Sequence, residues 1–124
     1  MSPLDAAARA MDHPWRWGTH DCCASACTAF ALLRGFDPMA PLRGTYSSAE
    51  GAAALIEEHG GWEAMADALA RRAALARVAG GAGALGLATG PWGFALVLGI
   101  GAGLWAGKTT RGFQLIDRVE MAWA

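Results

Sequence analysis

Apolar residues recur at helical spacing through the first 78 residues of the chain and fall in short bursts through the rest. The helical spacing predicts helices over 3–11, from Cys22 to about Arg34, and from Trp62 to about Arg77. A fourth helix is predicted between residues 47 and 60, because Gly60 and Gly61 interrupt the pattern there.

Residues suited to capping flank two of these predicted helices. Asp21 is expected to cap the start of the second helix with its carboxylate, and Gly35 is expected to end that helix in a left-handed conformation. Ser47 followed by Glu50 is typical of a capping box that opens the next helix.

Beyond Val78, short apolar runs alternate with glycines, a pattern that favours strands and tight turns. The predicted strands cover residues 83–89, 94–100, 103–108 and 113–119. Trp123 is expected to anchor the end of the chain. Helices followed by a small antiparallel sheet indicate an α+β fold. We expect one domain over 1–124, with helices over 1–78 packed on a sheet over 79–124.

The stretch 78–107 contains no charged residue and is long enough to cross a bilayer as a helix. Ten of its thirty residues are glycine and Pro91 interrupts its middle, both of which disfavour a helix. Buried strands are therefore the favoured interpretation, and a membrane helix remains the alternative.

Composition narrows the classes of function. Hydrophobic residues make up 54% of the chain and charged residues 17%, and the net charge is −1, so nothing favours disorder or nucleic-acid binding. The three cysteines lie within six positions, so they cannot join distant segments and are expected to be reduced thiols. The N-terminal residues lack the pattern of a secretion signal.

Cys22 is the candidate for chemistry, because it opens the second predicted helix directly after Asp21. Backbone N–H groups and the helix dipole favour a thiolate at that position, as in many cysteine nucleophiles. A peptidase also needs a proton acceptor, and His20 is the candidate nearest in sequence. The alternative is that Cys22 is a small apolar residue without activity.

No metal or cofactor is expected. His20, Cys22, Cys23 and Cys27 lie close together, but their spacing is not that of a zinc knuckle and no second pair follows. The glycine pattern that begins at Gly81 leads into a predicted strand, whereas a phosphate-binding loop leads into a helix.

The tryptophans divide into two predicted groups. Trp17 and Trp62 are expected in the core. Trp15, Trp92 and Trp105 adjoin predicted turns and are candidates for a partner surface, where aromatic side chains are favoured. Ordinary packing in the core is the favoured alternative for each of them.

Four short motifs together resemble a family of small phage and prophage proteins, usually encoded among tail-assembly genes, that are similar to NlpC/P60 cysteine peptidases. The motifs are Trp17–Cys22, Gly35–Pro38, Arg43–Tyr46 and Ala122–Trp123. The resemblance implies a papain-like core, with the nucleophile position of the peptidases at Cys22. It departs from the family at Gly93, which stands where the catalytic histidine begins its strand, and at Gly83–Ala84, where an aspartate is missing.

The resemblance implies a structural component of a phage-type tail tip with a degenerate peptidase fold. Its partners would be tail hub or distal tail proteins, and its location the virion, after assembly in the host cytoplasm. One alternative is a peptidoglycan-directed cysteine peptidase with Cys22 as nucleophile and His20, or a partner's residue, as base. Another is a small membrane-inserted phage protein built on 78–107.

Overall fold

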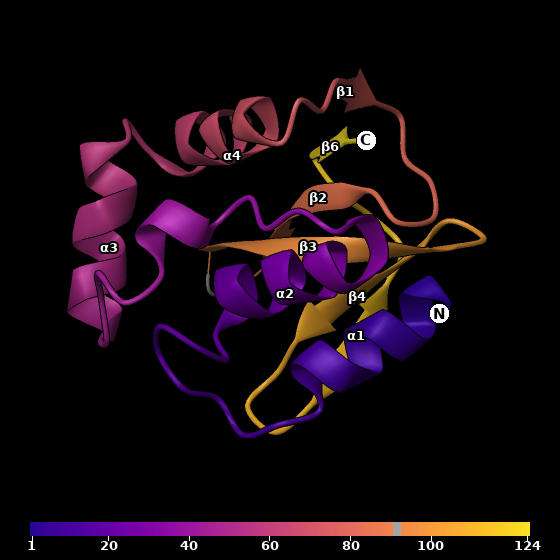
Figure 1. Ribbon diagram of the computed structural model, residues 1–124, viewed down its shortest axis with the longest axis horizontal. Helices are drawn as coiled ribbons and strands as arrows, with labels where there is room; N and C mark the ends of the chain where they lie inside the picture. Colours follow the sequence, from indigo (N-terminus) through magenta and orange to yellow (C-terminus); the bar gives the residue numbers. More distant parts are fainter. Residues whose placement is uncertain (91–92) are drawn as a thin grey trace.

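The computed structural model describes residues 1–90 and 93–124, which form four α-helices and six strands (Figure 1). The helices are α1 (Pro3–Met11), α2 (Cys22–Arg34), α3 (Ala49–Glu58) and α4 (Trp62–Arg72), with a 3₁₀ turn at Ala40–Leu42. The strands are β1 (Arg77–Val78), β2 (Leu85–Gly90), β3 (Gly93–Gly101), β4 (Leu104–Lys108), β5 (Phe113–Ile116) and β6 (Met121–Trp123). The predicted α+β class is confirmed.

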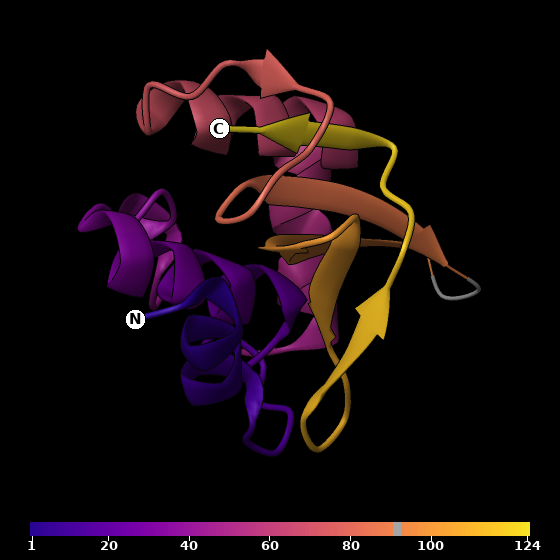
Figure 2. The ribbon, with the colours of Figure 1, turned by 90° about the vertical axis from the view of Figure 1, so that its right-hand side faces the viewer.

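The strands form one antiparallel sheet in the order β1-β6-β2-β3-β4-β5. Helices α1 and α2 pack beside each other on one face of this sheet (Figures 1 and 2). Strand β3 lies at the centre, so the N-terminal turn of α2 is held against the middle of the sheet.

The main core lies between α2 and the central strands. Small side chains of α2, including Ala24 and Cys27, are fully buried and let the helix approach the sheet closely. Leu87, Leu96 and Leu98 fill the facing side of β2 and β3 and are also buried. Burying these leucines stabilises the fold by about 1.5–3 kcal/mol per side chain.

The opposite face of the sheet is built on close contacts between glycines and Trp105. The Trp105 indole lies flat enough on β2 that a Cβ at Gly86 would stand 2.8 Å from it. A Cβ at Gly99 would collide with the backbone of Gly81. Trp105 is therefore buried, at 5% exposure, so it packs in the core and does not form a partner surface.

Three predicted boundaries are corrected. Helix α3 is capped by Ser48 and not by Ser47, because the Ser48 hydroxyl accepts the N–H of Gly51 at 3.0 Å. Helix α4 ends at Arg72 because Ala74, with φ of 57°, turns the chain. The segment Arg77–Val78 then pairs with β6, so the sheet begins inside the region predicted to be helical.

The uncharged stretch 78–107 forms β2, β3 and most of β4, as the glycine pattern predicts. Across residues 1–90 and 93–124, none of the helices has the length and apolar character needed to span a bilayer.

Candidate functional site

Cys22 begins helix α2, and its position is fixed by the aspartate before it. The Asp21 carboxylate accepts the N–H of Ala24 at 2.9 Å and so caps the helix, as predicted. The same carboxylate accepts the N–H of Gly18 at 2.7 Å and the hydroxyl of Tyr46 at 2.6 Å. Asp21 is 2% exposed, and these three donors compensate its buried charge.

Tyr46 reaches Asp21 because Gly18 lets the two loops approach. Gly18 has φ of 89°, and a Cβ there would stand 2.5 Å from the carbonyl oxygen of Tyr46. Burial, and then the hydrogen bond to Asp21, raise the pKa of Tyr46, so the phenol remains a donor across the physiological range.

A second set of contacts holds the loop after α2 against that helix. Arg43 pairs with Asp37 at 2.6 Å and also donates to the Ala24 carbonyl and the Thr28 hydroxyl. Three of the four motifs that carry the family resemblance therefore meet around the first half of α2. The sequence did not predict this meeting, because the partners lie as far as 25 residues apart.

Cys22 opens onto a cavity of about 600 Å³ with mostly apolar walls. Among the described residues, four aromatic side chains line the cavity, namely Trp15, Trp17, Trp62 and Phe94. The Trp15 and Trp17 rings meet edge to face with centroids 5.1 Å apart. A volume of this size, lined by aromatic groups, is typical of a ligand site.

The cavity corrects part of the tryptophan prediction. Trp17 is 37% exposed at the cavity and not in the core. Trp62 is half-buried and lies 6.3 Å from Phe94 between ring centroids. Trp15 is half-buried in the cavity wall, and Trp92 lies outside the described residues.

Gly93 lines the same cavity as Cys22, from the start of β3. Gly93 is the residue that stands in place of the peptidase histidine in the resemblance. Its φ of 105° lies in a region that side-chain-bearing residues rarely adopt. Among the described residues that line the cavity there is no histidine.

His20 does not line this cavity and makes its contacts with Thr19 and His13. Its Nδ1 lies 3.1 Å from the Thr19 hydroxyl, and its ring lies 4.7 Å from that of His13 between centroids. Burial and the nearby positive charges of His13, Lys108 and Arg16 lower the pKa of His20. No hydrogen bond joins His20 to Cys22 in the part of the chain that the structure describes.

The three cysteines differ in their electrostatics. The Cys23 thiol, and to a smaller degree the Leu96 N–H, lower the pKa of Cys22, although burial and the Asp21 charge oppose them. The pKa of Cys23 is raised by that same interaction and by burial. Burial raises the pKa of Cys27 to about 12. Cys22 is thus the one of these three thiols that is disposed to ionise.

Lys108, at the end of β4, also lines the cavity, but its ammonium is fully engaged. Its Nζ donates to the carbonyls of His13 at 2.5 Å, Thr109 at 2.7 Å and Gly112 at 3.3 Å. Burial lowers its pKa. Lys108 therefore joins the loop after α1 to the β4–β5 turn, a contact that the sequence did not predict.

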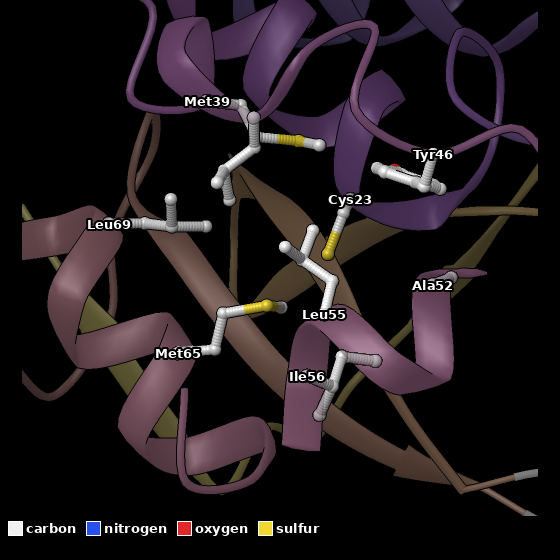
Figure 3. A pocket seen from close by; sticks show the side chains of 9 residues that line it. Cys23, Met39, Tyr46, Ala52, Leu55, Ile56, Met65 and Leu69 are labelled. Carbon is white, nitrogen blue, oxygen red and sulfur yellow. The ribbon is translucent and has the colours of Figure 1, made fainter. Parts of the chain in front are cut away.

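A second, smaller void of about 20 Å³ lies between α2, α3 and α4 (Figure 3). Leu55 of α3 and Met65 of α4 point toward Cys23 of α2 (Figure 3), and Ile56 also lines the void. Cys23 and Ile56 also line the larger cavity, so these two side chains separate the two spaces. Helix α3 is therefore a wall of both.

The fold and cavity define a class of protein, an α+β domain that presents a cysteine at a helix N-terminus inside an apolar cavity. Within the described residues, the His, Cys, Asp and Glu side chains form no group of three that could hold a metal. The chain belongs to the family described as a domain of unknown function, DUF6950, whose model matches residues 3–124. No curated protein and no solved structure matches the chain.

Proposed function

We propose that the chain is a structural component of a phage-type tail tip, built on an NlpC/P60-like peptidase fold without its catalytic histidine. The observation that carries this proposal is the cavity shared by Cys22 and Gly93, because a nucleophile position and an empty base position face one space. The partners would be tail hub or distal tail proteins, and the chain would reside in the virion after assembly in the host cytoplasm.

The chemistry of the cavity supports a structural role. Hydrolysis of an amide needs a group that takes the proton from the nucleophile and then gives a proton to the leaving amine. The charged groups among the described lining residues are Asp21 and Lys108, and each is engaged by three hydrogen bonds. A thiolate at a helix end can attack a carbonyl, but it cannot supply this proton.

The walls of the cavity also disfavour a cell-wall substrate. Peptidoglycan stem peptides carry carboxylates and amines, and buried charges require compensating partners. Asp21 and Lys108 are already compensated inside the protein, so neither of these two charges is free to bind a stem peptide. The alternative of a peptidoglycan-directed cysteine peptidase draws its support from the lowered pKa of Cys22.

Digestion of purified peptidoglycan separates the two functions. We expect the wild-type chain to release no more soluble fragments than a Cys22→Ala variant, measured by liquid chromatography and mass spectrometry. Release that disappears in Cys22→Ala would overturn the structural proposal in favour of the peptidase. A His20→Ala variant would then show whether His20 is the base.

Sedimentation tests the location in the tail. The chain, tagged in the genome that encodes it, is expected to co-sediment with purified tail particles in a density gradient. The Cys22→Ala variant should co-sediment equally, since assembly does not require the thiolate. A tagged chain that stays at the top of the gradient while tails form normally would contradict a role in the tail.

A further inference from the structure

The two edges of the sheet are built differently. On one side the sheet ends with β1, which has two residues and carries the charged Arg77. On the other side it ends with β5 (Phe113–Ile116), at the lower right of Figure 2. Proteins usually protect an edge strand with a charged residue, a proline or a bulge, because its unpaired backbone groups can bind another strand. Strand β5 contains no charged residue and no proline, and its register with β4 is regular.

The hydrogen bonds of the β4–β5 hairpin show which backbone groups of β5 face outward. Thr109 donates its N–H to the Gly112 carbonyl at 2.9 Å, so Gly112 faces β4. Inward-facing and outward-facing residues alternate in an antiparallel pair, so the even-numbered residues of β5 also face β4. The N–H and C=O groups of Phe113 and Leu115 therefore point to the outer edge. Among the described residues, no hydrogen bond reaches these four groups.

The sequence around β5 is complementary to a second copy of itself. Two copies that pair antiparallel about a twofold axis must bring outward-facing residues opposite one another. In the register centred on Gln114, Phe113 lies opposite Leu115 of the second copy, and Arg111 lies opposite its Asp117. The symmetry repeats both pairs. Arg111 and Asp117 are exposed, and within the described residues neither forms an ion pair.

The neighbouring registers that satisfy the same rule are less favourable. Centring the pair on Leu115 would place the Asp117 carboxylate opposite Phe113 and leave Arg111 without an opposite charge. Centring it on Phe113 would place the rest of β5 opposite the turn residues 110–112 of the second copy. Opposite charges and apolar pairs stabilise facing strands. Both kinds of pair therefore favour the register centred on Gln114.

We propose that two copies of this chain associate through β5, antiparallel to each other, with Gln114 at the twofold axis. The sheets of the two copies then form one continuous sheet. Leu115, which is 48% exposed, gains contact with Phe113 of the second copy. The contact is short, so the dissociation constant is on the order of 10 µM. This inference does not rest on the proposed function, because it requires neither a tail protein nor chemistry at Cys22.

Charge reversal, followed by analytical ultracentrifugation in reducing buffer of low salt, tests the interface. We expect the wild-type chain to pass from monomer to dimer between roughly 1 µM and 1 mM. Arg111→Asp and Asp117→Arg each place like charges opposite one another, so each should raise the dissociation constant about tenfold. The double variant restores opposite charges and should return to within about threefold of the wild type. Failure of the double variant to recover would contradict the facing of these two residues.

Cysteine substitution tests the register. Facing residues of a non-hydrogen-bonded pair have Cα atoms about 4.5 Å apart, a distance that a disulfide spans. Gln114→Cys should therefore give a disulfide-linked dimer under mild oxidation, with the link between the two copies of position 114 identified by peptide mass spectrometry. Leu115→Cys should not link to itself. A reversed preference between these two variants would overturn the register centred on Gln114.

A charge on either edge of the sheet provides a matched comparison. Leu115→Lys should leave the chain monomeric, because a lysine on an edge strand opposes pairing. Val78→Lys is the control, since Val78 is a 37% exposed apolar residue on β1 at the other edge, and this variant should dimerise like the wild type. Circular dichroism would show that both variants are folded.

Three results would exclude an interface at β5. They are a wild-type chain that stays monomeric up to about 1 mM, a dimer that Leu115→Lys does not weaken, and a dimer that Val78→Lys weakens equally. The proposed function is tested separately, by release of peptidoglycan fragments and by sedimentation with tails, so either proposal can fail while the other stands.

Discussion

Helices α2 and α3 both begin at a polar cap, yet the two starts are built differently. The cap of α2, Asp21, is 2% exposed and accepts three donors, and seven residues of the helix are buried. The cap of α3, Ser48, is exposed and accepts one N–H, and no residue of that helix is buried. The two caps look alike in the sequence, but in the folded protein they differ in burial and in the number of hydrogen bonds that they accept.

The two helix starts differ because the two helices hold different parts of the protein in place. Helix α2 holds Cys22 against the centre of the sheet, and its cap joins two loops through Gly18 and Tyr46. Helix α3 lies between Gly44 and Gly60, both with positive φ, and forms a wall of two spaces. A largely buried helix, α2, thus faces a helix without buried residues, α3, across the cavity.

The largest expected effect comes from breaking the buried cap. Asp21→Ala leaves the N–H groups of Gly18 and Ala24 and the Tyr46 hydroxyl without their acceptor. We expect the free energy of unfolding to fall by about 3 kcal/mol, measured by urea denaturation. Asp21→Asn, which keeps an acceptor oxygen, should lose less. A loss below about 1 kcal/mol for Asp21→Ala would show that the three contacts are not cooperative.

A smaller effect is expected from Tyr46→Phe, which removes one donor and keeps the ring. We expect a loss of about 1–1.5 kcal/mol near neutral pH. The pKa of Tyr46 is raised in the folded protein, so its contribution is full below the ordinary value of 10.0 and is lost as the pH rises above it.

The pH profile isolates this contribution. Cys27, whose pKa is raised to about 12, makes stability decline from about its ordinary value of 9.0 in both proteins. The difference in unfolding free energy between wild type and Tyr46→Phe should therefore shrink above pH 10. A difference that stays constant to higher pH would mean that Tyr46 ionises alike in the folded and unfolded chains.

The local signals were predictable from the sequence. The bounds of α1 and α2, the Asp21 cap and the left-handed Gly35 follow from side chains within a few residues of each helix end. The strands of the glycine-rich region were also predicted, because glycine disfavours the alternative helix there. Each of these predictions depends on residues that are close to one another in the sequence.

The tertiary contacts were not predictable in the same way. Whether a tryptophan faces the core or a cavity depends on which surface packs against it. Trp17, which was predicted to lie in the core, is exposed at the cavity. Trp105 is buried because Gly86, on a neighbouring part of the sheet, leaves room for its indole. The hydrogen bond between Tyr46 and Asp21 could not be predicted from neighbouring residues, because 25 positions of the sequence separate the two.

The smallest expected effect tests the weaker helix start. Ser48→Ala removes the single capping bond of α3, so the amide hydrogens of residues 52–58 should exchange about fivefold faster. The global free energy of unfolding should change by less than about 0.5 kcal/mol, because no residue of α3 is itself buried. Ser47→Ala is the matched control, since the neighbouring serine does not cap the helix, and it should leave exchange unchanged. A global loss in Ser48→Ala as large as that in Asp21→Ala would mean that α3 unfolds together with α2, and the contrast between a rigid and a loosely held cavity wall would be wrong.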